Sequence, residues 1–107
     1  IITIPLSGAV AHKDSTGGNG IIYSGNVQIM SAGSGVKHSE YNASDRDILH
    51  LLQIWIFPKH KNIQPRYDQR SFDVADRLNK WQIIVSPDEE SGSLWINQDA
   101  VFALADL

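Results

Sequence analysis

Short apolar or alternating runs, separated by turns rich in glycine, constrain the fold of this chain most strongly. Residues 27–31 alternate, with Val27 and Ile29 on one face and Gln28 and Met30 on the other, as in a half-buried β-strand. Runs of the same kind predict further strands at residues 1–6, 9–12, 21–23, 36–42, 81–85, 93–96 and 100–104. Several short strands at this spacing indicate a sandwich or a barrel, so the sequence predicts an all-β fold.

Three connecting segments are interpreted from their turn residues and polarity. Residues 14–20 are a cluster of turn formers and are expected to form the loop of a hairpin. Ser44 and Asp47 have the spacing of a helix capping box, but the β-branched and aromatic residues that follow favour a strand within residues 48–57. Residues 59–80 are polar, with apolar side chains too sparse for a packed helix, and are expected to form a connection.

The composition allows one modest core and narrows the possible chemistry. Of the 107 residues, 42% are hydrophobic and 20% are charged, as in ordinary globular chains. There is no cysteine, which excludes a disulfide framework, a thiolate metal site and a cysteine nucleophile. Any metal site must therefore use nitrogen and oxygen ligands. The lack of cysteine also fits a reducing compartment, and we expect a cytoplasmic location.

Several functional classes are disfavoured by charge and pattern. The net charge of −3 argues against direct contact with nucleic acid, because DNA-binding surfaces are clustered and basic. No apolar run approaches the ~20 residues of a membrane-spanning helix, so no membrane contact is expected. Residues 17–20 contain three glycines but lack the lysine and the following helix of a phosphate loop, and are assigned to the hairpin turn.

His38 and Glu40 are the candidate site residues. They are two positions apart, and in a β-strand residues with this spacing point to the same face. An imidazole and a carboxylate together suit iron, manganese, nickel, copper or zinc better than calcium or magnesium. The alternative interpretation, two polar residues on a solvated strand face, is open on spacing alone.

The other histidines are not assigned to a site. His12, two residues before Asp14, is expected to be a hairpin residue bonded to nearby backbone or to a carboxylate. His50 lies between two leucines and His60 between two lysines, and neither has a second metal-binding residue at ligand spacing.

The residues around the candidate pair resemble the pirin family, a bicupin branch of the cupin superfamily. The matching stretches are residues 8–15 (GAVAHKDS), 25–40 (GNVQIMSAGSGVKHSE), 52–56 (LQIWI), 65–69 (PRYDQ), 86–88 (SPD) and the span 92–100. The second stretch is similar to the second cupin motif, with Gly25, Gly33, His38 and Asn42 in order. It departs from the general motif at Ser31, where proline is usual, and in a longer gap before His38, and both departures resemble the pirin variant.

This resemblance implies a cupin-like fold, a jelly-roll or double-stranded β-helix barrel that is incomplete in this chain. Residues 1–66 would be the remainder of an N-terminal metal-binding cupin, 67–80 the connection between domains, and 81–107 the first strands of a C-terminal cupin. The family's metal site has three histidines and one glutamate, and its first two histidines come from an upstream His-x-His motif. Only His38 and Glu40 can be carried over, and we expect the chain to be a fragment of a longer bicupin.

For activity, the resemblance implies a quercetin 2,3-dioxygenase type of reaction, the oxidative ring opening of a flavonol by O2. One mononuclear transition metal is implied, with Fe(II) expected first and Ni, Mn, Cu and Zn as alternatives. Glu40 would also be the catalytic proton acceptor. Two alternatives are open: an iron-dependent, redox-sensitive accessory protein of transcription regulation that binds a protein partner, and a truncated chain that has no activity and lacks its metal.

Assembly is predicted from the incomplete barrels. Unpaired sheet edges and uncovered side chains at Ile2, Ile4, Trp95 and Phe102 are expected to seek partners. The chain is therefore predicted to associate with a second copy or with the rest of its parent protein.

Overall fold

The computed structural model describes residues 1–15, 17–33, 35–59 and 65–107. The elements are β1 (Ile2–Ser7), β2 (Ala9–Asp14), β3 (Asn19–Tyr23), β4 (Asn26–Ser31), β5 (His38–Asn42), β6 (His50–Ile54), β7 (Arg66–Ser71), the 3-10 helix η1 (Val74–Arg77), β8 (Gln82–Ser86), β9 (Leu94–Trp95) and β10 (Phe102–Leu104). The expected all-β, cupin-like fold is confirmed. No helix in these ranges is long and apolar enough to cross a membrane.

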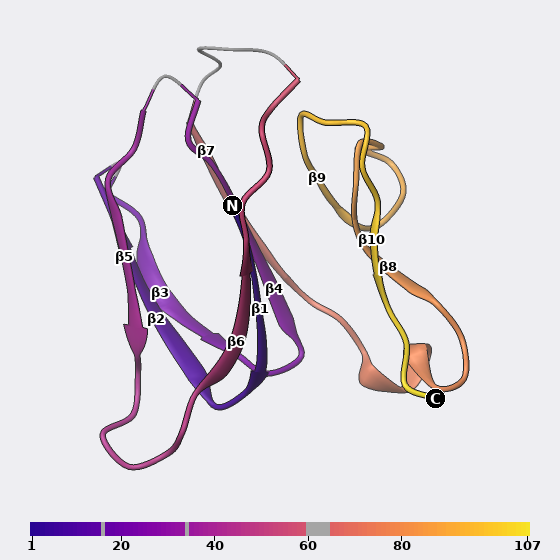
Figure 1. Cartoon of the computed structure of the whole chain (residues 1–107), viewed down its shortest axis with the longest axis horizontal. Helices are drawn as coiled ribbons and strands as arrows, with labels where there is room; N and C mark the ends of the chain where they lie inside the picture. Colours follow the sequence, from indigo (N-terminus) through magenta and orange to yellow (C-terminus); the bar gives the residue numbers. More distant parts are fainter. Residues whose placement is uncertain (16, 34, 60–64) are drawn as a thin grey trace.

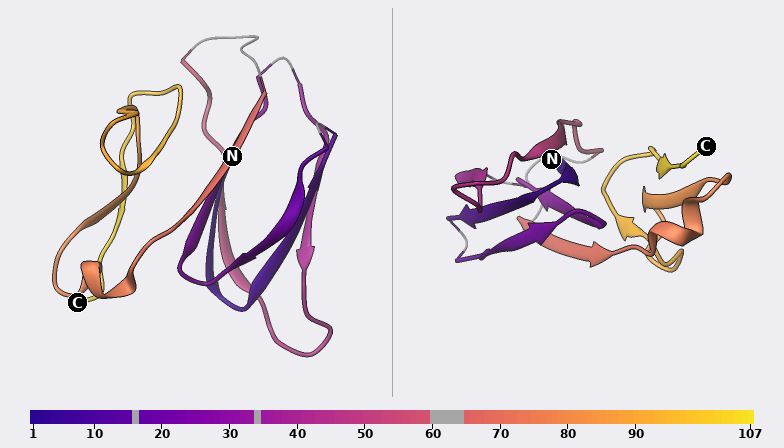
Figure 2. Two further views of the ribbon diagram at one scale, coloured as in Figure 1. Left: turned by 180° about the vertical axis from the view of Figure 1, so that it is seen from behind. Right: turned by 90° about the horizontal axis from the view of Figure 1, so that it is seen from below.

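The strands form three sheets arranged in layers. The first sheet has the order β6-β1-β4-β7, the second β3-β2-β5 and the third β10-β8-β9. In Figure 1 the second sheet lies at the left, the first in the middle and the third at the right. The view from behind in Figure 2 reverses the order from left to right and again has the first sheet in the middle, so this sheet has a neighbour on each of its faces.

Alternation in the first sheet gives it two chemically different faces. Ile2 pairs with Ile29 and with Ile54, while the next row joins Thr3 to Gln28 and to Gln53. The isoleucine row packs against the third sheet in the apolar core, whose buried members are Ile2, Ile4, Val27, Ile29, Ile84, Val85, Leu94 and Ile96. The polar row faces the second sheet, because strand neighbours point to opposite sides.

The third sheet covers residues that the sequence predicted to be uncovered. Ile2 is 0% exposed and Ile4 is 4% exposed, so this part of the prediction is wrong. Trp95 and Phe102 are half-buried. The physical reason is that strands β8 and β9 lie on the apolar face of the first sheet and remove it from water.

Strand β7 occupies part of the segment that was expected to be a connection. Arg66–Ser71 pairs with β4 over its whole length, with Tyr67 opposite Met30. The sequence did not predict this strand because polar and apolar residues do not alternate in it. One face of β7 is directed toward the polar row of the first sheet, and the other carries arginines. The path from β7 to the third sheet then passes through η1, whose first turn is capped by the Asp73 side chain. The division of the chain into two cupin domains stays a prediction.

Two arginines of β7 link the first sheet to the third. The guanidinium of Arg66 lies 3.9 Å from the centre of the Trp95 ring and donates a hydrogen bond to the Trp95 carbonyl. Arg70 donates to the carbonyls of Gly92 and Ser93, the latter at 3.2 Å. These contacts hold the β9 segment against the edge of the first sheet.

The remaining turn assignments are confirmed. Strands β2 and β3 form the predicted antiparallel hairpin, and Asp14 accepts a hydrogen bond of 3.0 Å from the amide of Gly18 in its loop. Ser44 accepts bonds from the amides of Arg46 and Asp47, so the capping pattern closes a turn and no helix follows. The chain then enters β6 as a strand.

Candidate metal centre

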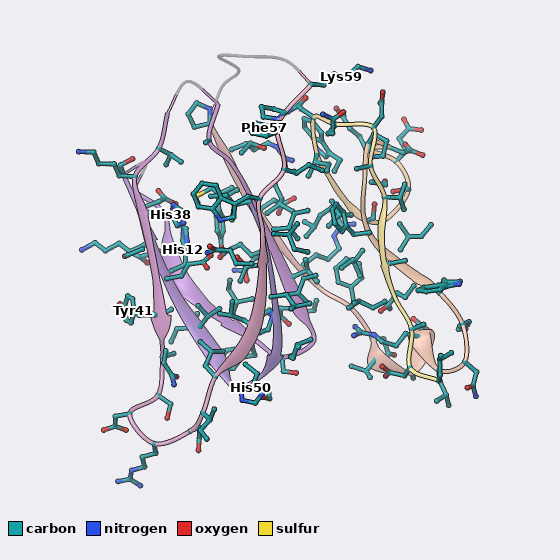
Figure 3. The ribbon with its side chains drawn as sticks, in the orientation of Figure 1. His12, His38, Tyr41, His50, Phe57 and Lys59 are labelled. Carbon is teal, nitrogen blue, oxygen red and sulfur yellow. The ribbon has the colours of Figure 1, made fainter. Side chains whose placement is uncertain are left out.

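Strand β5 places both predicted site residues on its inner face. His38 and Glu40 are half-buried, whereas Tyr41, the next residue of the strand, is 57% exposed. Pairing with β2 sets Glu40 opposite His12 and His38 opposite Asp14. Figure 3 shows the His38 and His12 side chains directed inward, toward the first sheet, and Tyr41 directed away. The inference that His38 and Glu40 share one face is therefore correct.

The Glu40 carboxylate is held by three hydrogen-bond donors. Its Oε1 accepts from Thr3 Oγ1 and from Gln28 Nε2, each at 2.7 Å. Its Oε2 accepts from Gln53 Nε2, also at 2.7 Å. All three donors belong to one row of register partners across β6, β1 and β4. The first sheet thus presents a polar row to the carboxylate on the second sheet.

Two aromatic donors fix the orientation of the glutamine amides in this row. Tyr67 donates its hydroxyl to Gln28 Oε1 at 2.9 Å, and Trp55 donates its indole N–H to Gln53 Oε1 at 3.0 Å. Because each amide oxygen is an acceptor for an aromatic donor, each amide nitrogen is directed toward Glu40. Sequence reasoning did not identify these residues; the only signal was that Thr3 and Gln28 are polar positions inside strands.

His12 lies beside the candidate pair but is already engaged. It is 2% exposed, and its Nε2 lies 2.7 Å from Asp14 Oδ2, which confirms the expected bond to a carboxylate. Its ring is stacked toward His38, with 6.4 Å between ring centres, and on Tyr67, with 4.7 Å. Within the described part of the chain, its Nδ1 is buried without a hydrogen-bond partner.

The Tyr67 phenol stays protonated far into the alkaline range. Burial raises the pKa of Tyr67 to about 12, with smaller contributions from the negative charges of Asp14, Glu40 and Asp68. A protonated hydroxyl can donate, so the bond to Gln28 persists at neutral pH. The orientation of the Gln28 amide is therefore insensitive to ordinary changes of pH.

The donor set fits part of a mixed nitrogen and oxygen site. His38 offers a ring nitrogen and Glu40 offers a carboxylate oxygen, which suit a divalent transition metal. No group of three or more His, Asp or Glu residues that could hold a metal occurs among residues 1–15, 17–33, 35–59 and 65–107. His50 is at the far end of β6 from the pair, as Figure 3 shows, and His60 lies outside the described residues. A complete site therefore needs ligands beyond these two.

An apolar cavity of about 260 Å³ opens between the first sheet and the β9 segment. Its lining includes Ile29, Met30, Trp55, Phe57 and Ile96. Neither His38 nor Glu40 belongs to this lining, so the cavity is separate from the candidate metal ligands.

Comparison with known proteins finds a matching family model, similar curated proteins and similar solved structures. The family model described as Pirin matches residues 1–56. The chain is 48% identical over 99 residues to a protein of Escherichia coli strain K12 named quercetin 2,3-dioxygenase, a match that covers 92% of this chain and 42% of the relative.

The crystal structure of YhhW from Escherichia coli superposes with a TM-score of 0.84 at 48% identity. A crystal structure of bacterial pirin YhhW in complex with nickel(II), from the same organism, superposes with a TM-score of 0.81 at 46% identity. Both matches cover 92% of this chain and 41% of the solved chain. The chain thus spans less than half the length of the relatives it matches.

Proposed function

The chain belongs to the pirin family, and from this premise we propose that it supplies two ligands of a mononuclear metal centre that acts on a flavonol-like substrate with O2. The observation that carries the proposal is the inward pair on β5, in which Glu40 is held by three donors and His38 lies beside it. A relative named quercetin 2,3-dioxygenase supports the substrate class. We further propose a cytoplasmic location, which the absence of cysteine supports.

The identity of the metal is part of the proposal. The family resemblance favours Fe(II), and the nickel(II) complex of a similar protein supports Ni(II) as well. His38 would bind the ion through a ring nitrogen and Glu40 through Oε2, with the remaining ligands supplied from outside the described residues. When bound, the ion would act as a Lewis acid that orients the substrate oxygens.

Glu40 is proposed as the proton acceptor for the substrate hydroxyl. Among the described residues, only Gln53 donates to its Oε2, so one acceptor position would be open to the substrate proton when the carboxylate is not bound to the metal. A general base must lie within about 3 Å of the proton that it removes, and a carboxylate on the inner face can meet a substrate there. Thr3 and Gln28 keep the carboxylate in place during this step.

The test uses the full-length protein that contains these 107 residues, purified without metal and reloaded with Fe(II) or Ni(II). We expect one ion per chain and, with quercetin, loss of the flavonol absorbance matched by uptake of O2. The control is Ser39→Ala, which changes an exposed position between the two ligands. Stoichiometric metal without any consumption of flavonol or O2 would contradict the enzyme proposal and favour the accessory role in transcription.

A further inference from the structure

The two oxygens of the Glu40 carboxylate have different surroundings. Oε1 accepts two hydrogen bonds of 2.7 Å, from Thr3 and Gln28. A carboxylate oxygen has two lone-pair positions, so Oε1 is saturated. From the residues that the structure describes, Oε2 accepts one bond, from Gln53, which leaves one position for another group.

The donors to the two oxygens also differ in burial. Thr3 and Gln28 are both 0% exposed, whereas Gln53 is an exposed residue of strand β6. A buried donor that loses its acceptor cannot turn to water instead, so the bonds to Oε1 resist replacement. An exposed amide can exchange its partner for water, so the bond to Oε2 is easily replaced.

The backbone pairing of the sheet does not require polar side chains at Thr3 and Gln28. An apolar residue at position 3 or 28 would satisfy the backbone ladder equally well and would avoid burying a polar side chain. The Gln28 amide is itself held by Tyr67, which prevents the amide from turning its oxygen toward Glu40. Thr3 and Gln28 thus both direct a donor at Oε1 of Glu40.

We propose that Thr3 and Gln28 are positioning residues that occupy Oε1 of Glu40 and so reserve Oε2 for the metal ion or the substrate proton. This inference rests on the proposed function of Glu40. Gln53 occupies one acceptor position of Oε2, and because this side chain is exposed it can also give up that position to a ligand. Hydrogen bonds of this kind orient metal ligands, and their loss typically lowers metal affinity by about 10- to 100-fold.

A pair of substitutions at Thr3 separates positioning from packing. Thr3→Val keeps the shape of the side chain but removes the hydroxyl, whereas Thr3→Ser keeps the hydroxyl but removes a buried methyl group. We expect Thr3→Val to weaken Ni(II) binding by about 10-fold, and Thr3→Ser to bind like the parent. If packing alone mattered, Thr3→Ser would be the weaker binder, and that order would overturn the proposal.

A second pair tests Gln28 against a matched glutamine. Gln28→Met removes the amide and keeps a side chain of similar length. Gln69→Met makes the same change at an exposed residue, the register partner of Gln28 in β7. Binding of Ni(II) to the full-length protein is measured by calorimetry, and the electronic spectrum of the bound ion reports its ligand geometry. We expect weaker binding and a changed spectrum for Gln28→Met only. Equal affinity and an identical spectrum in both variants would refute the role of Gln28.

A measurement on the metal-free protein distinguishes the positioning role of Thr3 and Gln28 from the proposed metal centre. Crystal structures of the metal-free parent, Thr3→Val and Gln28→Met should show the Glu40 carboxylate displaced or in two conformers in the variants only. An unmoved carboxylate would overturn the positioning role whatever the metal affinity. Failure of the parent to bind Ni(II), with the carboxylate displaced in the variants, would instead contradict the proposed metal centre.

Discussion

At the scale of single residues, the candidate site combines a carboxylate that hydrogen bonds hold in place with a less constrained imidazole. Glu40 receives three hydrogen bonds of 2.7 Å. His38 has a ring contact with His12, and no hydrogen bond within the described part of the chain involves its imidazole. The orientation of the carboxylate is thus fixed by hydrogen bonds, whereas that of the imidazole is not.

We predict that His38→Ala removes metal binding from the full-length protein while leaving its fold unchanged. The side chain is half-buried and makes no hydrogen bond with described residues, so its loss leaves no buried donor unpaired. Metal content after gel filtration and far-UV circular dichroism would check both parts. Retention of a stoichiometric ion would show that His38 is not a ligand.

Replacing the carboxylate by an amide should affect Oε2 most. In Glu40→Gln, Thr3 and Gln28 both donate, so the new amide oxygen takes the place of Oε1 and its nitrogen the place of Oε2. A nitrogen with two hydrogens neither accepts a proton nor binds a metal. We expect turnover to be lost and metal affinity to fall by more than the about 10- to 100-fold that follows the loss of a residue that only orients a ligand, measured by O2 uptake and calorimetry. Normal turnover would exclude Glu40 as the proton acceptor.

The raised pKa of Tyr67 predicts a loss of stability in alkali. Folding raises this pKa from 10.0 to about 12, mainly by burial, so between these values the folded chain holds a proton that the unfolded chain has lost. The free energy of unfolding therefore falls as pH rises through this window and is unaffected by Tyr67 below it. Urea unfolding over this range should show a smaller decline for Tyr67→Phe. Identical declines would contradict the prediction.

At the scale of elements, the first sheet separates an apolar core from a polar interior. Its isoleucine row contacts the third sheet, and its row of Gln53, Thr3 and Gln28 faces β5. Strands β6, β1 and β4 therefore each contribute both to the apolar core and to the candidate site. A shift of one residue in register would exchange the two faces and remove the donors from Glu40.

Arg66 should be necessary for attachment of the third sheet to β7. Its planar guanidinium both stacks on Trp95 and donates to the Trp95 carbonyl, and lysine cannot reproduce the stack. We expect Arg66→Lys to lower the free energy of unfolding by about 1–2 kcal/mol. The same substitution at the exposed Arg46 serves as control. Thermal unfolding followed by Trp fluorescence would measure both, and equal midpoints would exclude a stabilising role for the stack.

At the scale of the whole molecule, large apolar side chains remain on the surface. Trp55 is 72% exposed, Phe57 90% and Trp81 75%. Trp55 and Phe57 lie at the apolar cavity beside the third sheet. Exposed aromatic side chains of this size favour association.

We therefore predict that the isolated 107-residue chain does not persist as a monomer of 11.9 kDa. Light scattering combined with intact-mass analysis should find dimers or larger species, because association covers the exposed aromatic side chains. Phe57→Ser, at the most exposed of these positions, should shift the distribution toward monomer. A stable, monodisperse species of 11.9 kDa for the parent chain would disprove the prediction.

The strands around the site could be predicted because their alternation is local. The two-residue spacing of His38 and Glu40 was sufficient to place them on one face, since this depends only on the backbone of a single strand. The hairpin at residues 14–20 followed from its turn residues in the same way. Strand β7 could not be predicted, because both of its faces are polar and its stability comes from pairing with β4.

What the sequence by itself determined is that β4 has two faces, one apolar and one carrying Gln28. Only the tertiary structure decided what each face meets: the apolar face meets the third sheet, and Gln28 meets Glu40 from a strand 12 residues away. The row of donors also needs Thr3 and Gln53, which come from strands that are far apart in sequence. Their alignment depends on register between strands, which is set by the packing of the whole sheet and by no local pattern.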